Sequence, residues 1–192
     1  MAATPLAEAR RGLVELVNAE GEDWGHVALG VAVCVGAVAA GALIAARYAP
    51  TDDHPDVKRV YDRLEQPRFK PPAGVFKAVW PALFSMLTWS GLRVWNAERT
   101  TERTRAFWLW SAIQGLNALW MAWSPRHRGA QLLTALTTFG VTALYVTQAR
   151  KVDPRAAAMV APYAGWIGFA NILTEEVWRK NRGKTPDGHT IH

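Results

Sequence analysis

Three side chains on one apolar stretch are the first candidates for chemistry. Gln114, Asn117 and Trp120 follow one another at intervals of three residues, which keeps them near one face of an α-helix. Their amides and indole N–H can donate and accept hydrogen bonds, but they supply no nucleophile and no acid–base pair. Inside a membrane such groups need partners, so we expect this face to point into a helix bundle. There the groups would bond either to neighbouring helices or to a ligand.

Four charged side chains lie in or near apolar stretches, namely Lys77, Arg93, Glu175 and Glu176. A charge within a membrane segment is by default a functional hypothesis. The two basic residues lie within two turns of their expected helix ends, so their long side chains are expected to reach the membrane surface. The two acids precede Arg179 and Lys180 by four positions each, so we expect two ion pairs along one helix.

The remaining reactive residue types predict no metal site and no catalytic site. The histidines are His26, His54, His127, His189 and His192. Of these, only His189 and His192 form an H-x-x-H pattern, and it lies in a polar tail without further ligands nearby. Cys34, the one cysteine, lies in an apolar stretch where a packing role is expected. The chain also lacks a P-loop, a dinucleotide fingerprint and a nucleophile elbow, so we expect no cofactor and no enzymatic activity.

The elements that must position these residues are apolar segments. Residues 27–46 contain no charged side chain, and about 20 such residues can cross the hydrocarbon core of a bilayer. We predict five transmembrane helices at about 25–46, 73–95, 107–123, 130–149 and 156–178. The predicted fold class is therefore all-α, an integral membrane bundle (25–178) with an N-terminal extension (1–24) and a polar C-terminal tail (179–192). Pro81 and Pro162 lie within two of these helices, where we expect kinks.

The composition supports a membrane location. The ten tryptophans are many for 192 residues, and several stand at the edges of apolar segments, where indole rings prefer to lie. A tryptophan-rich soluble core is the alternative, but it does not explain the uncharged first segment. The net charge of +6 comes mainly from residues between the apolar segments, which favours an orienting role over nucleic-acid binding. Its distribution weakly predicts an N-terminus outside and a C-terminus inside.

The first residues do not resemble a cleaved signal. Acidic and basic residues are mixed there, whereas targeting segments avoid acids or begin with a basic patch. Residues 5–19 carry leucines at helical spacing, which predicts a short amphipathic helix. Such a helix could lie on the membrane surface or dock on a partner, and a disordered tail is the other interpretation.

The segment 60–80 connects the first two apolar segments and contains Pro71 and Pro72. Proline at 71 disfavours helical dihedrals at Lys70, whereas Pro72 suits a first helical turn. We therefore expect a charged loop that passes into the second transmembrane helix and lies against the mouth of whatever the bundle encloses.

This segment also resembles a known family. The residues that carry the resemblance are, in order, Tyr61, Leu64, Pro67, Phe69, Pro71, Pro72, Phe76 and Trp80. They are similar to the first loop and second helix of the translocator protein family, also called tryptophan-rich sensory proteins (TspO). Residues 114–120, residues 162–170 and the sequence at 178–181 provide further anchors in the same order. The resemblance covers about 47–181.

The resemblance implies a five-helix membrane bundle, often dimeric, with a pocket beneath the first loop. In that family the pocket binds porphyrins, sterols or synthetic aromatic compounds. Carried over position by position, the ligand-binding residues would be Phe69, Trp80, Asn117, Trp120, Trp166, Phe169 and Ala170. The implied partners are membrane lipid, a hydrophobic tetrapyrrole or sterol, and a second copy of the chain. Family members occur in bacterial envelopes and in mitochondrial membranes.

Some positions depart from the family pattern. Certain bacterial members are reported to degrade tetrapyrroles in light with two tryptophans, of which one falls on Trp80 and the other near 174–176, where this chain has Thr-Glu-Glu. The same replacement removes the aromatic residue of a cholesterol-recognition pattern between Leu173 and Arg179. These departures leave a second hypothesis open. The bundle could be a structural accessory subunit of a larger membrane complex, such as a respiratory complex, without ligand chemistry.

Overall fold

The computed structural model describes residues 5–123 and 127–183, and the described residues contain helices but no strand. The helices are α1 (Pro5–Leu16), α2 (Trp24–Tyr48), α3 (Pro55–Asp62), α4 (Ala73–Trp95), α5 (Thr101–Ala122), α6 (Arg128–Val152) and α7 (Pro154–Lys180). The predicted helices of the bundle are all present. Residues 124–126 and the H-x-x-H pattern of His189 and His192 lie outside the described residues.

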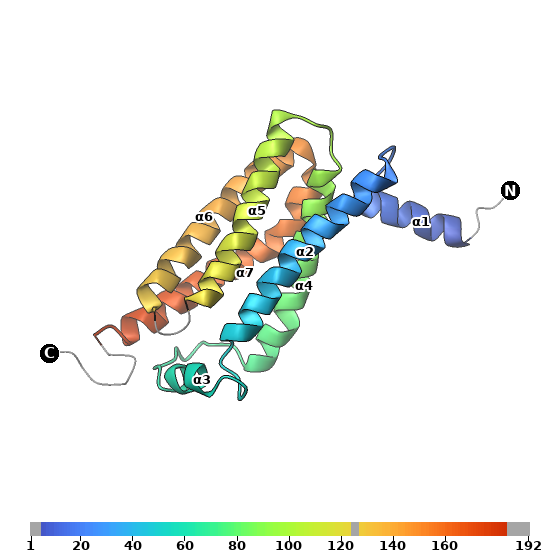
Figure 1. The fold of residues 1–192 in the computed structure, drawn as a ribbon. Helices are drawn as coiled ribbons and strands as arrows, with labels where there is room; N and C mark the ends of the chain where they lie inside the picture. Colours follow the sequence, from blue (N-terminus) through green and yellow to red (C-terminus); the bar gives the residue numbers. More distant parts are fainter. Residues whose placement is uncertain (1–4, 124–126, 184–192) are drawn as a thin grey trace.

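The five long helices form one bundle (Figure 1). Helix α2 contacts α4 and α5, α4 contacts α7, and α6 packs between α5 and α7, which closes a ring of neighbours. Helices α2, α6 and α7 are each long and apolar enough to cross a membrane on their own. The fold is therefore the predicted all-α membrane bundle, in which α4 and α5 pack against these three helices.

The centre of the bundle is built from large side chains that also satisfy polar groups. Trp110 is almost completely buried, and its indole N–H donates to the carbonyl of Leu87 at 2.8 Å. Tyr145 shares a 2.6 Å hydrogen bond with Ser90, whose hydroxyl also lies 2.7 Å from the carbonyl of Ala156. Because α4, α6 and α7 meet through these bonds, their rotation about their own axes is fixed.

The helix ends differ from the predicted bounds where a cap extends the helix beyond the apolar segment. Helix α5 begins at Thr101, well before the predicted start at 107, because the side chain of Thr100 accepts from the backbone N–H of Arg103. Helices α4 and α7 continue through Pro81 and Pro162. The apolar pattern therefore predicts which residues cross the membrane, whereas the capping residue decides where the helix begins.

Arg93 does not reach the membrane surface, and this prediction was wrong. Its side chain is buried, and its Nε lies 2.6 Å from a carboxylate oxygen of Asp153. Its Nη1 donates to the carbonyls of Glu15 and Leu16 at the end of α1. The end of α4 is covered by α1 and by the start of α7, so the guanidinium finds protein partners instead of water.

The expected ion pairs of Glu175 and Glu176 along α7 also differ in the structure. Arg179 pairs with Glu176, three positions away, at 2.6 Å. Lys180 pairs instead with Glu65 of the first loop at 3.0 Å. The four-residue spacing predicts ion pairs for an isolated helix. The end of α7 contacts the first loop, so Lys180 pairs with Glu65 there.

Helix α3 was not predicted and lies within the expected charged loop (Figure 1). Pro55 occupies its first turn, and Val60 is its buried residue. Lys58 donates to Asp62 one turn later at 3.3 Å, and this bond raises the pKa of Lys58. The loop is therefore partly ordered before it reaches α4.

Candidate ligand site beneath the first loop

Aromatic side chains from the first loop, α4 and α7 meet at the end of the bundle that carries α3. We call the following residues the aromatic cluster: Phe69, Phe76, Trp80, Phe84, Trp166 and Phe169. Trp166 is its centre, with ring centroids 6.4 Å from Trp80 and 5.6 Å from Phe169. Phe69 meets Phe169 edge to face at 6.4 Å and is about half exposed. Four of the five predicted aromatic residues, namely Phe69, Trp80, Trp166 and Phe169, are thus brought together.

Polar groups lie beside the cluster on α5 and α7. The hydroxyl of Tyr163, one turn before Trp166, donates to Asn117 Oδ1 at 2.8 Å. Asn117 Nδ2 and Trp166 Nε1 are buried and have no hydrogen-bond partner within the described residues, and the same holds for Gln114 Nε2. Two predicted residues, Asn117 and Trp166, therefore present unused donors in the interior.

The last two predicted residues are less closely tied to the cluster. Trp120 is half-buried on α5, and its backbone carbonyl accepts from Gln131 at 3.5 Å. Among the described residues no ring contact joins its indole to the cluster. Ala170 follows Phe169 on α7, and its carbonyl accepts from Thr174 at 2.7 Å. Neither residue has a contact that assigns it a binding role.

The first loop is fastened to the end of α7 by a side chain that sequence reasoning missed. Asn181 is nearly completely buried, and its amide pairs with the backbone of Glu65. Its Oδ1 accepts from the Glu65 N–H and its Nδ2 donates to the Glu65 carbonyl, both at 3.0 Å. With the ion pair between Lys180 and Glu65, we call these contacts the loop latch. Asn181 was part of the 178–181 anchor, but no local signal gave it this partner.

The loop also carries basic residues next to Phe69. Arg68 is exposed, and the ammonium of Lys70 lies 4.5 Å from the centre of the Tyr61 ring. Cation–π contact of this kind fixes a lysine without neutralising its charge. The loop beside the aromatic cluster thus carries positive charge on both sides of Phe69.

Comparisons with known proteins identify the family of this chain. The profile of the TspO/MBR family matches residues 31–179. The human translocator protein is 31% identical over 135 residues, covering 68% of this chain and 79% of that protein. The tryptophan-rich sensory protein of Cereibacter sphaeroides is 27% identical over 164 residues, covering 83% of this chain and 93% of that protein. The match begins within α2, runs almost to the end of α7 and includes all of the predicted site residues, and the chain belongs to the TspO/MBR family of membrane proteins.

Proposed function

We propose that this protein binds a flat, polycyclic ligand of the tetrapyrrole class between the first loop and the aromatic cluster. The observation that carries the proposal is the pair of buried donors, Trp166 Nε1 and Asn117 Nδ2, which have no partner among the described residues. Leaving such a donor unpaired costs about 1–3 kcal/mol, so an acceptor on a ligand would recover free energy there. The ring faces of Trp80 and Trp166 supply the apolar contact area.

The positive charges on the first loop favour a tetrapyrrole over a sterol. A porphyrin carries carboxylates at its edge, whereas a sterol carries one neutral hydroxyl. Arg68 and Lys70 flank Phe69, so a carboxylate leaving the aromatic cluster would meet positive charge. A ligand of this kind would place its rings inside and its acids at the loop.

The proposal is binding without turnover. Thr174, Glu175 and Glu176 stand near the position of the second tryptophan that the light-dependent family members use. Of the two tryptophans that those members use, this chain therefore has only the one at Trp80. Illumination of the protein with protoporphyrin is therefore expected to degrade it no faster than illumination of the Trp80→Phe variant.

Fluorescence titration tests the binding site. Protein in mild detergent is titrated with protoporphyrin while the tryptophan emission is followed, and saturable quenching is expected. Trp166→Phe is predicted to weaken binding about tenfold, since it removes one donor and part of a ring. The same variant should change the unfolding temperature of the unliganded protein little, because the lost ring contacts cost packing while the removed indole N–H, which has no partner among the described residues, no longer has to be desolvated. Trp108→Phe, at an exposed position, is the matched control and should change neither property.

A ligand without carboxylates distinguishes the contribution of the aromatic rings to binding from that of the charges on Arg68 and Lys70. Protoporphyrin dimethyl ester keeps the rings but lacks the carboxylates, so it should bind more weakly than the free acid. The double variant Arg68→Gln/Lys70→Gln should remove this difference. Equal affinity for acid and ester in the unaltered protein would contradict the tetrapyrrole assignment and favour a sterol.

The oligomeric state tests the second hypothesis of a structural subunit. For a ligand-binding protein we expect migration near a dimer on a native sizing gel, together with saturable quenching. Co-migration with a complex of many subunits and unsaturable quenching would overturn the binding proposal. The bundle would then be a scaffold that retains the family fold.

A further inference from the structure

Helix α1 lies at the end of the bundle where α2 begins, and it extends away from the other helices (Figure 1). None of its residues is buried, yet its last turn is held by two buried side chains of α4 and its C-cap. Arg93 donates to the carbonyls of Glu15 and Leu16 at 2.6 and 2.9 Å. Asn96 donates to the carbonyl of Val17 at 2.8 Å. The helix is therefore fixed to the bundle at its C-terminal end, whereas its first turns lie beyond the bundle.

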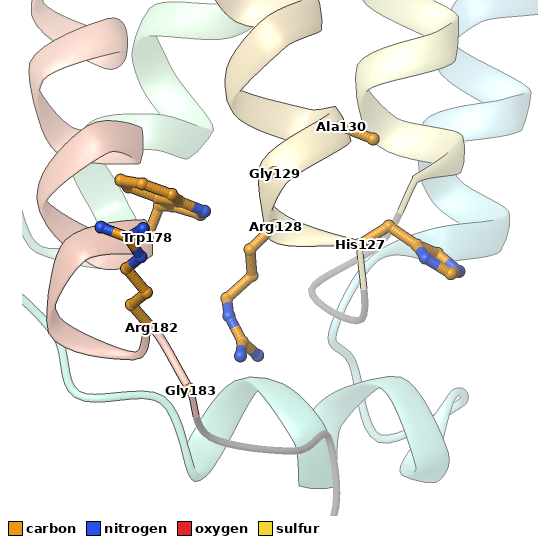
Figure 2. A pocket seen from close by; sticks show the side chains of 7 residues that line it. All are labelled: His127, Arg128, Gly129, Ala130, Trp178, Arg182 and Gly183. Atoms are coloured by element: carbon orange, nitrogen blue, oxygen red, sulfur yellow. The ribbon is translucent and has the colours of Figure 1, made fainter. Parts of the chain in front are cut away.

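The start of α2 marks one surface of the membrane. Helix α2 has 25 residues from Trp24 to Tyr48, and at about 1.5 Å each they cover the roughly 30 Å hydrocarbon core. Trp24 is 58% exposed, and the guanidinium of Arg10 lies 5.1 Å from the centre of its ring. The same pairing occurs at the opposite end of the bundle, where Arg182 lies 5.1 Å from the centre of the Trp178 ring (Figure 2). Since indole rings prefer the headgroup level and arginines reach toward it, α1 lies at the level of one membrane surface.

One face of α1 points toward the bundle. Leu6, Leu13 and Val17 share this face, because they are separated by seven and four positions. Val17 continues the helix, since its N–H donates to the carbonyl of Leu13 at 3.1 Å, and its side chain packs against the hydrophobic core. Arg10, one turn after Leu6, reaches Trp24 from the same face. The two leucines therefore point to the side on which the bundle lies, but at positions beyond its edge.

The two faces of α1 differ in polarity. Leu6 and Leu13 are 83% and 64% exposed, so the protein itself hardly covers them. The opposite face carries the exposed side chains of Glu8, Arg11 and Glu15. Helix α1 contains two acidic and two arginine residues and so has no net charge. An amphipathic helix at the level of the membrane surface lies along that surface with its apolar face toward the acyl chains.

The apolar face of α1 continues a surface that already contacts lipid. Helix α2 crosses the membrane, and near its start the side chains of Leu29, Val31 and Val35 are exposed. In a bilayer these side chains contact acyl chains. The leucines of α1 lie above the edge of this surface, next to Trp24. Lipid is therefore the occupant that covers both helices without a second protein.

We propose that α1 lies along the membrane surface of the leaflet where α2 begins, with Leu6 and Leu13 inserted among the acyl chains. Its partner is the lipid bilayer, and the hydrogen bonds from Arg93 and Asn96 hold the helix at this level. Because α1 has no net charge, a bilayer of neutral lipid is sufficient. The inference concerns the opposite end of the bundle from the first loop and does not rest on the tetrapyrrole proposal.

Spin labels on the full chain report which face of α1 contacts lipid. Four variants, Leu6→Cys, Leu13→Cys, Glu8→Cys and Arg11→Cys, are each labelled with a nitroxide and reconstituted in phosphatidylcholine vesicles. Cys34 is fully buried, so the unaltered chain, treated in the same way, is the control for labelling. Labels at the two leucine positions should collide several-fold more often with oxygen than with a water-soluble nickel chelate. Labels at the two charged positions should show the reverse.

The alternatives give different patterns. Access of the nickel chelate to all four labels would place α1 in water and overturn the proposal. Labels at the leucine positions that neither oxygen nor the chelate reaches would mean that protein covers this face, and the lipid assignment would be wrong. The lipid pattern should also persist in vesicles that contain phosphatidylglycerol. A pattern that appears only with phosphatidylglycerol would contradict insertion by the leucines.

A matched pair of substitutions tests whether the leucines hold the helix in the membrane. A nitroxide is attached in the variant Ala9→Cys, at an exposed position between the two leucines. Adding Leu13→Ser removes one apolar anchor, so the label should become several-fold more accessible to the nickel chelate. Adding Arg11→Ser on the opposite face should leave the accessibility unchanged. Both replaced side chains are exposed, so neither variant should unfold at a lower temperature in detergent. Equal accessibility of the label in the two variants would contradict the proposal.

Discussion

Replacing Asp153 by Asn is predicted to destabilise the bundle because it leaves Arg93 buried without its counter-charge. The two side chains are 8% and 6% exposed and lie 2.6 Å apart. Removing one partner of such a buried pair costs about 3–5 kcal/mol. Asn keeps an oxygen that can cap α7, where Asp153 now accepts from the backbone N–H groups of Arg155 and Ala156, so we expect the lower end of this range.

Thermal unfolding in detergent measures the effect. For a chain of this length, about 3 kcal/mol corresponds to a fall of about 6–12 °C in the unfolding temperature. The control is Arg155→Gln, which breaks the exposed ion pair with Glu15 and should leave the unfolding temperature unchanged. The double variant Arg93→Met/Asp153→Asn should lose less than the single Asp153→Asn, since no unpaired charge remains. If Asp153→Asn and Arg155→Gln behave alike, the buried pair contributes nothing and Asp153 serves only as a cap.

The remaining predictions concern the core and the loop latch. A Cβ at Gly91 would lie 2.5 Å from the Trp110 ring, so Gly91→Ala should cost about 1–3 kcal/mol in chemical unfolding, whereas Gly140→Ala, in open space, should be neutral or slightly stabilising. A loss of stability at Gly140 equal to that at Gly91 would refute the packing argument. Asn181→Ala should release the first loop, so trypsin should cleave within residues 55–70 faster than in the unaltered protein. An unchanged cleavage rate would mean that the latch does not hold the loop.

The helices of the bundle could be predicted from the sequence because each one corresponds to a continuous apolar segment. An uncharged segment long enough to cross a bilayer identifies α2, and the segment 73–95 gave the bounds of α4. Helix α3 was missed, since eight residues with one buried side chain carry little apolar pattern. The early start of α5 depends on the cap at Thr100, which lies outside the apolar segment.

The site could be predicted only in part. The family resemblance assigned Phe69, Trp80, Trp166 and Phe169 to the site, and the structure joins their rings, whereas Trp120 has no ring contact with them among the described residues. The hydrogen bonds that hold the first loop over the site join residues far apart in the sequence, such as Asn181 and Glu65, which are 116 residues apart. No helical spacing indicates such a pair, because the partners meet only after the bundle has formed.

Mapping the ligand by photolabelling tests the central claim most directly. A photoreactive porphyrin is bound to the detergent-solubilised protein, irradiated, and located by peptide mass spectrometry with excess protoporphyrin as competitor. The account predicts competed adducts on the peptides that carry Phe69, Trp80 and Trp166, with loss of labelling in Trp166→Phe. Adducts confined to α1 and α2, or adducts that excess protoporphyrin does not remove, would contradict a ligand site beneath the first loop.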